Sequence, residues 1–144
     1  MASNMESLNG SPLIAIPQPL HIRLDFATTD ALRRLVTVGC RAIHFSGHGN
    51  ETHLYFEDGF AGVHPVPNEN LRSLFSAGGS NDVKLVFVSA CSSAPLANAF
   101  VNAGVPHVVA VKLNERIEDH AAIEFTKAFY YTVHIIYTNV ISSN

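Results

Sequence analysis

Short apolar runs that alternate with amphipathic segments constrain the fold of this chain more than any other feature. Four runs rich in Val, Ile, Leu and Phe predict strands over residues 20–26, 41–47, 84–90 and 107–111. The segments that follow them have apolar residues at helical spacing, which predicts helices over residues 28–39, 68–79, 92–106 and 118–133. Strands that are separated by helices are typical of a parallel sheet built through crossover connections.

The ends of the predicted helices carry residues that favour starting or stopping a helix. The starts are marked by Thr28, Asn68 and Pro95, and the ends by Gly39, Gly78 and Gly104. Because most of the strands between them are apolar nearly throughout, the sheet is expected to be covered on both faces. The predicted fold class is therefore three-layer α/β, with a mostly parallel central sheet and helices on both faces.

Two segments depart from the alternation. Residues 47–67 contain two apolar runs around an acidic-Gly turn, which predicts a β-hairpin that projects from the sheet. Residues 11–16 read as a further strand, but only the sequence PQPL separates them from the run at 20–26, too short for a parallel crossover. We therefore treat residues 1–19 as a poorly defined N-terminal segment with a candidate first strand, followed by one domain over residues 20–132.

Composition excludes several classes of protein. A chain of 144 residues is expected to bury one core, and a net charge of -3 with 15% charged residues gives no basic surface for nucleic acid. No apolar stretch reaches the length of a membrane span, and the N-terminus lacks the features of a signal peptide. We expect a cytoplasmic protein with no nucleic-acid or membrane partner, in which Cys40 and Cys91 are free thiols.

His48 and Cys91 each follow the end of an apolar strand, and those two strands are sequential members of the predicted sheet. Because ligands bind beyond the carboxyl ends of parallel strands, the two side chains are expected to face one crevice. Cys91 also precedes a predicted helix whose first turn begins near Ser92 and Ser93, where the helix dipole favours a thiolate. His48 can take the thiol proton, and the N–H groups of Gly49 and Cys91 can hold an oxyanion. This pattern indicates a cysteine peptidase.

The same residues carry a family resemblance. The stretches HFSGHG and VFVSACSS, whose His48 and Cys91 lie 43 residues apart, resemble the paired signatures of the caspase-like superfamily of caspases, metacaspases, gingipains and separase. Within it the chain is most similar to CHAT domains, since AGVPHVVAV and DHAAIEFTKAFY also resemble that family, and the likeness covers residues 20–132. The resemblance implies a caspase-like fold with His48 as base, Cys91 as nucleophile and Gly49 as oxyanion donor. It also implies that Asp119 faces a basic P1 side chain of the substrate.

The chain departs from the family in three places. CHAT domains often have His directly after the Cys, where this chain has Ser92. Family members run longer at both ends, and residues 133–144 do not resemble them. We therefore expect a truncated or alternatively spliced product that is weakly active or inactive, with regulatory repeats in a longer parent chain.

Ordinary structural roles remain open for several of these residues. A Cys at the end of a buried strand is usually a small core residue, and Asp119 also suits the start of a helix. His44 is interpreted as sheet packing and Cys40 as core. The expected function is a cysteine endopeptidase that acts on a peptide or protein, without a metal or an organic cofactor. The alternative is a catalytically inactive CHAT module that serves as a binding or scaffold domain.

Overall fold

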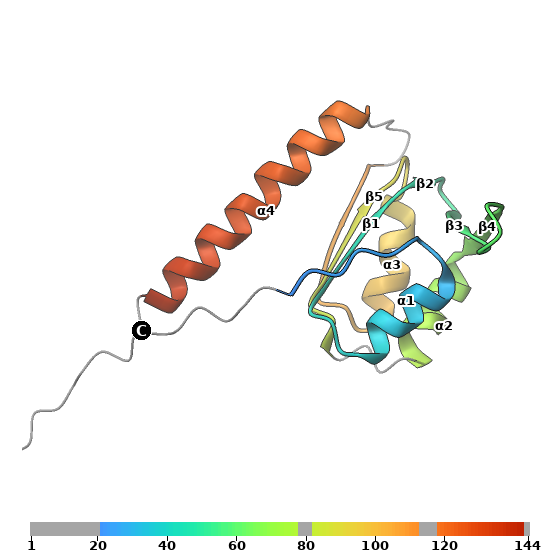
Figure 1. Ribbon diagram of the computed structural model, residues 1–144, viewed down its shortest axis with the longest axis horizontal. Helices are drawn as coiled ribbons and strands as arrows, with labels where there is room; N and C mark the ends of the chain where they lie inside the picture. The colour runs from blue at the N-terminus through green and yellow to red at the C-terminus, as the bar shows by residue number, and fades with distance from the viewer. Residues whose placement is uncertain (1–20, 78–81, 113–117, 143–144) are drawn as a thin grey trace, which may run out of the picture.

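A three-stranded parallel sheet lies at the centre of the structure, a computed structural model that describes residues 21–77, 82–112 and 118–142 (Figure 1). Its strands are β1 (Ala42–Ser46), β5 (Leu85–Ser89) and β6 (His107–Ala110), in the order β1-β5-β6. Both neighbouring pairs are parallel, as the alternating pattern predicts. The sheet therefore brings the carboxyl ends of β1 and β5 side by side.

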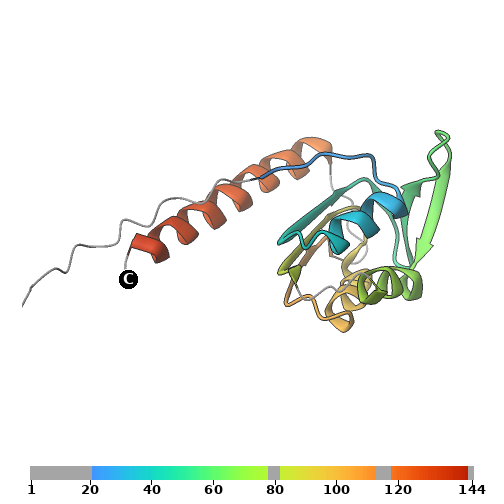
Figure 2. The ribbon, with the colours of Figure 1, turned by 60° about the horizontal axis from the view of Figure 1, so that its bottom comes forward.

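A small antiparallel sheet follows β1 directly. It consists of β2 (His48–Gly49), β3 (His53–Glu57) and β4 (Val63–Pro67), and β3 and β4 form the β-hairpin predicted within residues 47–67. Figures 1 and 2 show this hairpin projecting from the rest of the chain. Its turn is held by Asp58, whose Oδ1 accepts the N–H groups of Phe60 at 2.7 Å and Gly62 at 2.9 Å. These hydrogen bonds lower the pKa of the Asp58 carboxyl group.

Helices bury one face of the parallel sheet, whereas the β1 side chains that point to the other face, at Ala42, His44 and Ser46, remain exposed, so the predicted cover on both faces is only partial. Val86 and Val88 of β5 belong to one buried core cluster with residues of α1 (Thr29–Thr37), α2 (Asn68–Ala77) and α3 (Ala94–Asn102). Phe87 lies between them in the strand and points to the other face, where its ring meets those of Phe125 and Phe129 in α4 (Asp119–Ser142). None of the helices in the described ranges has the length and apolar content that a membrane crossing requires.

Residues 21–27 do not form the strand predicted over 20–26. Ile22, Leu24 and Phe26 alternate with polar residues, but they are 75%, 92% and 76% exposed. Among the described residues the segment meets a strand at its end, where the Ala27 carbonyl oxygen accepts the Glu57 N–H of β3 at 2.7 Å. The alternation was therefore a misleading signal, because a strand needs a neighbour to accept its backbone hydrogen bonds. The parallel sheet consequently has three described strands where four were predicted.

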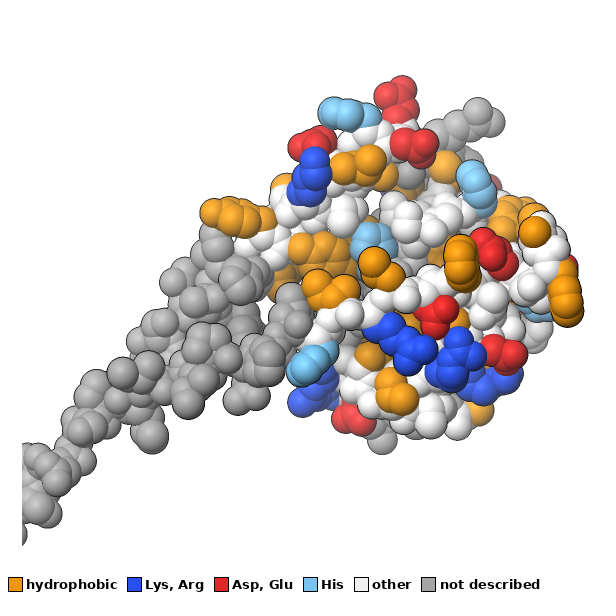
Figure 3. Space-filling view, in the orientation of Figure 1, with side chains coloured by type: hydrophobic (Ala, Val, Ile, Leu, Met, Phe, Trp, Pro, Cys, Tyr) orange, Lys and Arg blue, Asp and Glu red, His pale blue; other side chains and the backbone are white. Residues whose placement is uncertain are grey.

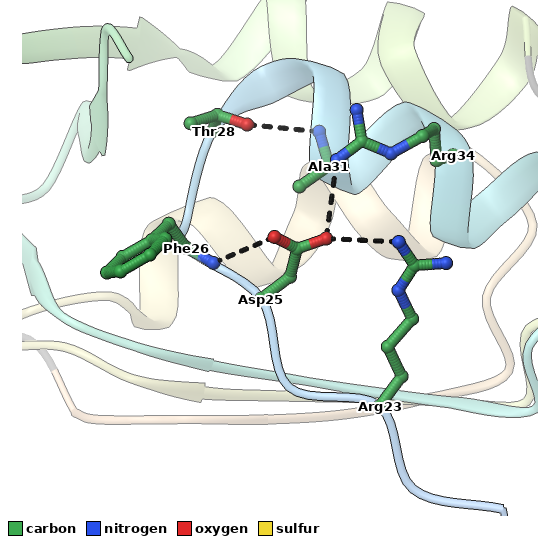
Figure 4. A network of polar contacts seen from close by, with 6 residues as sticks. All are labelled: Arg23, Asp25, Phe26, Thr28, Ala31 and Arg34. Carbon is green, nitrogen blue, oxygen red and sulfur yellow. Dashed lines mark hydrogen bonds and ion pairs between the residues drawn. The ribbon is translucent and has the colours of Figure 1, made fainter. Parts of the chain in front are cut away.

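Polar contacts attach this extended segment to α1 (Figure 4). The Asp25 carboxylate accepts hydrogen bonds from Arg34 of α1 at 3.3 Å, from Arg23 at 3.4 Å and from the Phe26 N–H at 3.1 Å. The Arg34 guanidinium is the main reason that the pKa of Asp25 lies below its usual range. The polar side of the segment thus faces α1 and its apolar side chains remain exposed.

The predicted helix ends are confirmed in part. Thr28 caps α1 through its hydroxyl, which accepts the Ala31 N–H at 3.1 Å, and Pro95 lies in the first turn of α3. The predicted cap at Asn68 is wrong: α2 begins at Asn68 itself, and the buried Asn68 Oδ1 has no hydrogen-bond partner among the described residues. Gly78 and residues 1–19 lie outside the described residues, and α4 continues through residues 133–142.

Candidate active site

The register of the parallel sheet aligns His48 with Cys91. Each β1 residue pairs with the β5 residue 43 positions later, from Ala42 with Leu85 to Ser46 with Ser89, and His48 and Cys91 are separated by the same 43 positions. The pairing extends beyond the strands, because the Gly47 N–H donates to the Ser89 carbonyl oxygen at 3.1 Å. The structure therefore places both residues at the same edge of the sheet, directly after two hydrogen-bonded strands.

The backbone segments that carry the two residues are in contact. A Cβ atom added to Gly49 would lie 3.2 Å from the Cβ of Ala90, so the residue after His48 packs against the residue before Cys91. Such an added atom would also lie 3.0 Å from Leu54 Cδ2 and 3.2 Å from the His53 carbonyl oxygen. Any side chain at position 49 would therefore push the two segments apart, which gives glycine a packing role at this position.

His48 is exposed and is held in β2 by pairing with Tyr55 of β3. The turn between β2 and β3 is closed by Asn50, whose Oδ1 accepts the N–H groups of Thr52 at 2.9 Å and His53 at 2.8 Å. The Asn50 Nδ2 donates to the Tyr55 hydroxyl at 2.7 Å. These bonds fix the short strand on which the imidazole is mounted.

The N–H of Gly49 points out of this hairpin. The Asn50 N–H donates to the His53 carbonyl oxygen of β3 at 2.9 Å, and the preceding residue, Gly49, is paired with Leu54. Because successive residues of an antiparallel strand direct their N–H groups to opposite sides, the Gly49 N–H is directed away from β3. It is thus oriented away from its own ladder, as an oxyanion donor must be.

Cys91 is partly buried and lies in a sharp turn between β5 and α3. The turn includes Ser92, which has a φ of 49°. Residues other than Gly and Asn seldom adopt this left-handed backbone conformation. Such strained residues cluster at functional sites, where the surrounding structure holds them in place. Helix α3 begins at Ala94, slightly later than predicted, so Cys91 lies three residues before its positive end.

Ser93 is the polar residue at this site that the sequence did not indicate. Its side chain is completely buried, and its Oγ accepts the Val111 N–H at 3.0 Å and lies 3.5 Å from the Val88 carbonyl oxygen. The Ala94 N–H donates to the Val111 carbonyl oxygen at 2.7 Å. No local pattern predicts these bonds, because Val111 lies 18 residues further along the chain.

Asp119 is the first residue of α4, and it is exposed. The start of α4 lies at the same end of the sheet as the carboxyl ends of β1 and β5 (Figure 1). The structure thus places Asp119 at this end of the sheet and equally at a helix start, and no hydrogen bond or ion pair joins it to His48 or Cys91.

Cys40 and His44 do not belong to this edge, because Cys40 precedes β1 and His44 lies in the middle of that strand. The Cys40 thiol is partly buried beside the core, and this burial raises its pKa. The His44 ring packs on Phe87 and Tyr130, with ring centroids 4.6 Å and 5.7 Å away, which agrees with its interpretation as a packing residue. Within the described ranges, no three His, Cys, Asp or Glu side chains gather closely enough to hold a metal ion.

Comparison with protein families matches residues 11–134 to the CHAT domain. No curated protein matches the sequence. The family match includes β1 with His48, the projecting hairpin, β5 with Cys91 and the first part of α4, which are the elements that build the site. Since it spans more than half of the 144 residues, the chain belongs to the CHAT domain family, a caspase-like peptidase family.

Proposed function

We propose that this chain is a cysteine endopeptidase in which His48 and Cys91 act as a catalytic dyad. The observation that carries this proposal is the shared register: both residues lie two positions beyond the last β1–β5 pair, at the carboxyl edge of a parallel sheet. This edge is where open α/β sheets bind their ligands. The contact between Gly49 and Ala90 supports the proposal, because it keeps the two backbone segments together.

The dyad would work by peptide acyl transfer. His48 removes the thiol proton, and the Cys91 sulfur attacks the carbonyl carbon of the scissile peptide bond to form a tetrahedral oxyanion. When this intermediate collapses, the C–N bond breaks and His48 returns the proton to the leaving amine, which leaves a thioester on Cys91. His48 then takes a proton from water as the hydroxyl oxygen attacks the thioester, and the acid product leaves as the thiol is restored.

The oxyanion would be held by two backbone N–H groups, those of Gly49 and Cys91. The Gly49 N–H is suited to this role because the ladder directs it away from β3. Pre-positioned donors of this kind typically contribute about 10² to 10³ in rate each. The start of α3, three residues after Cys91, would also help to stabilise the negative charge that develops at the site.

We extend the proposal to specificity for a basic P1 residue through Asp119. Its exposure and the position of the α4 start support a carboxylate that can pair with an Arg or Lys of the substrate. The competing role is stabilisation of the α4 start, since acidic residues are favourable in a first helical turn. Substitution by Asn distinguishes the two roles, because Asn retains helix-starting character and removes the charge.

The test is cleavage of fluorogenic peptides with varied P1 residues by the protein and by Cys91→Ala, His48→Ala and Asp119→Asn variants. Cys40→Ala is the matched control, since it removes the other thiol. We expect peptides with Arg or Lys at P1 to be cleaved by the protein and by Cys40→Ala, and not by Cys91→Ala or His48→Ala. Cleavage that survives Cys91→Ala would refute the peptidase proposal, and an unchanged P1 preference in Asp119→Asn would remove Asp119 from the site.

A binding or scaffold module is the second candidate, and one observation favours it. Ile22, Leu24 and Phe26 are exposed in a row along the segment before α1. Figure 3 shows hydrophobic side chains exposed at several places on the face that it draws. Exposed apolar rows of this kind are typical of interaction surfaces. If no peptide is cleaved and a thiol-directed peptide with Arg at P1 fails to label Cys91, this second function becomes the better explanation.

A further inference from the structure

Ser93 is a fully buried polar residue two positions after Cys91, and its hydroxyl joins three parts of the chain. The Oγ is 3.0 Å from the Val111 nitrogen, just after β6, and 3.5 Å from the Val88 carbonyl oxygen, in β5. A hydroxyl can accept from the first group and donate to the second at the same time. The turn that contains Cys91 is therefore tied to the ends of two neighbouring strands.

Ser93 does not use its hydroxyl to cap α3, although it occupies the N-cap position. Its backbone has φ −82° and ψ −4°, and its side chain makes no capping hydrogen bond. The N–H of Ala94 donates instead to the Val111 carbonyl oxygen at 2.7 Å, so Val111 is bound through both its N–H and its carbonyl. The Ser93 side chain thus stabilises the connection to the end of β6 and does not stabilise the start of α3.

This connection restrains a turn that is under strain. Ser92 has a φ of 49°, and a non-glycine residue in that region persists only when neighbouring contacts determine it. Those contacts come from Ser93 on one side and from the packing of Ala90 against Gly49 on the other. Loss of the Ser93 hydroxyl leaves the Val111 N–H without its partner and allows the turn to relax.

We infer that Ser93 is a positioning residue, which holds Cys91 in its reactive orientation by fixing the turn between β5 and α3 to the end of β6. The inference rests on the proposed role of Cys91 as nucleophile. Ser93 itself contacts no reacting atom. Its effect is to hold the sulfur beside the start of α3 and opposite His48, so the thiol loses reactivity when the turn relaxes.

The test is the rate of alkylation by iodoacetamide near neutral pH, followed separately at Cys91 and Cys40 by mass spectrometry. In Ser93→Ala, we expect the Cys91 rate to fall about tenfold, because the turn no longer holds the sulfur in its reactive orientation. Cys40 should keep its rate. Ser93→Thr, which retains a hydroxyl, should stay within about threefold of the unchanged protein, and Ser73→Ala, which removes an exposed helix hydroxyl, should have no effect.

Three results would overturn the inference. The first is a Ser93→Ala protein that melts at a lower temperature but keeps the Cys91 rate, since Ser93 would then only stabilise the fold. The second is a faster Cys91 reaction in Ser93→Ala, which would mean that the hydroxyl limits access to the sulfur. The third is an equal loss of rate in Ser73→Ala. Because alkylation requires no peptide cleavage, the measurement decides the role of Ser93 even if the endopeptidase proposal fails.

Discussion

Gly49→Ala tests the packing that keeps His48 and Cys91 at one site. The added methyl group would lie 3.2 Å from the Ala90 Cβ and 3.0 Å from Leu54 Cδ2. Carbon atoms prefer separations of about 3.5–4.0 Å, so the segment at residue 49 must move by about 0.3–1 Å. Part of that movement has to separate β2 from the end of β5, because β2 is confined on its other side by β3.

The expected loss of stability follows from this overlap. Overpacking at a buried contact costs about 1–3 kcal/mol, which for a chain of this size lowers the melting temperature by about 3–10 °C. The displacement should also affect the chemistry, because misplacement by about 1 Å can cost about 100-fold in rate. Thermal unfolding followed by circular dichroism measures the first effect, and alkylation of Cys91 or peptide cleavage measures the second.

Gly59→Ala is the matched control. Gly59 lies in the hairpin turn with φ +86°, and an added Cβ there would have no atom within 4 Å, so the substitution strains the backbone without moving His48. It should lower the melting temperature and leave Cys91 unaffected. The argument is refuted if Gly49→Ala melts at the same temperature as the unchanged protein, or if both variants affect Cys91 equally.

Three further predictions follow from other contacts. Iodoacetamide should label Cys91 faster than Cys40 near neutral pH, since burial raises the pKa of Cys40, and mass spectrometry showing equal rates would contradict this. Burial lowers the pKa of His44, so the unfolded chain binds more protons than the folded one, and the free energy of unfolding should fall as the pH drops through about 6.5. Denaturant unfolding at several pH values should show a smaller fall for His44→Gln than for the unchanged protein. An identical fall in both would remove His44 as a cause. Thr28→Ala should cost about 1 kcal/mol by removing the α1 cap, whereas Thr37→Ala, at the exposed end of that helix, should cost less in the same thermal unfolding assay.

The features that the sequence predicted well depend on local signals. Apolar runs gave β1, β5 and β6, and Thr28 and Pro95 gave the starts of α1 and α3. The adjacency of the His48 and Cys91 strands followed from the tendency of sequential strands to be neighbours in a parallel sheet, and their pairing confirms it. These features can be predicted without knowing which residues far along the chain they contact.

The features that were missed depend on such partners. The alternation in residues 21–27 is compatible with a strand, but the segment meets β3 at its end, through Ala27, and is otherwise held by Asp25. Asn68 has the chemistry of a cap, yet its side chain does not serve as one. The bonds of Ser93 to Val111 and the left-handed Ser92 arise only when β6 is in place, so no window of sequence around Cys91 reveals them.

The single residue between β1 and β2 sets what can vary in this domain. Gly47 is the one residue between β1 of the parallel sheet and β2 of the antiparallel one, and the rings of Phe45 and Phe56 bridge the two sheets with centroids 5.0 Å apart. Insertions at the tip of the β3–β4 hairpin lengthen the chain between His48 and Cys91, but they add to a projection and leave each residue at the end of its own strand. An insertion beside Gly47 moves His48 further from the end of β1, and so displaces it from Cys91 in space. Diversification of this domain is therefore expected to accumulate at the hairpin tip, while the joint at Gly47 keeps a constant length.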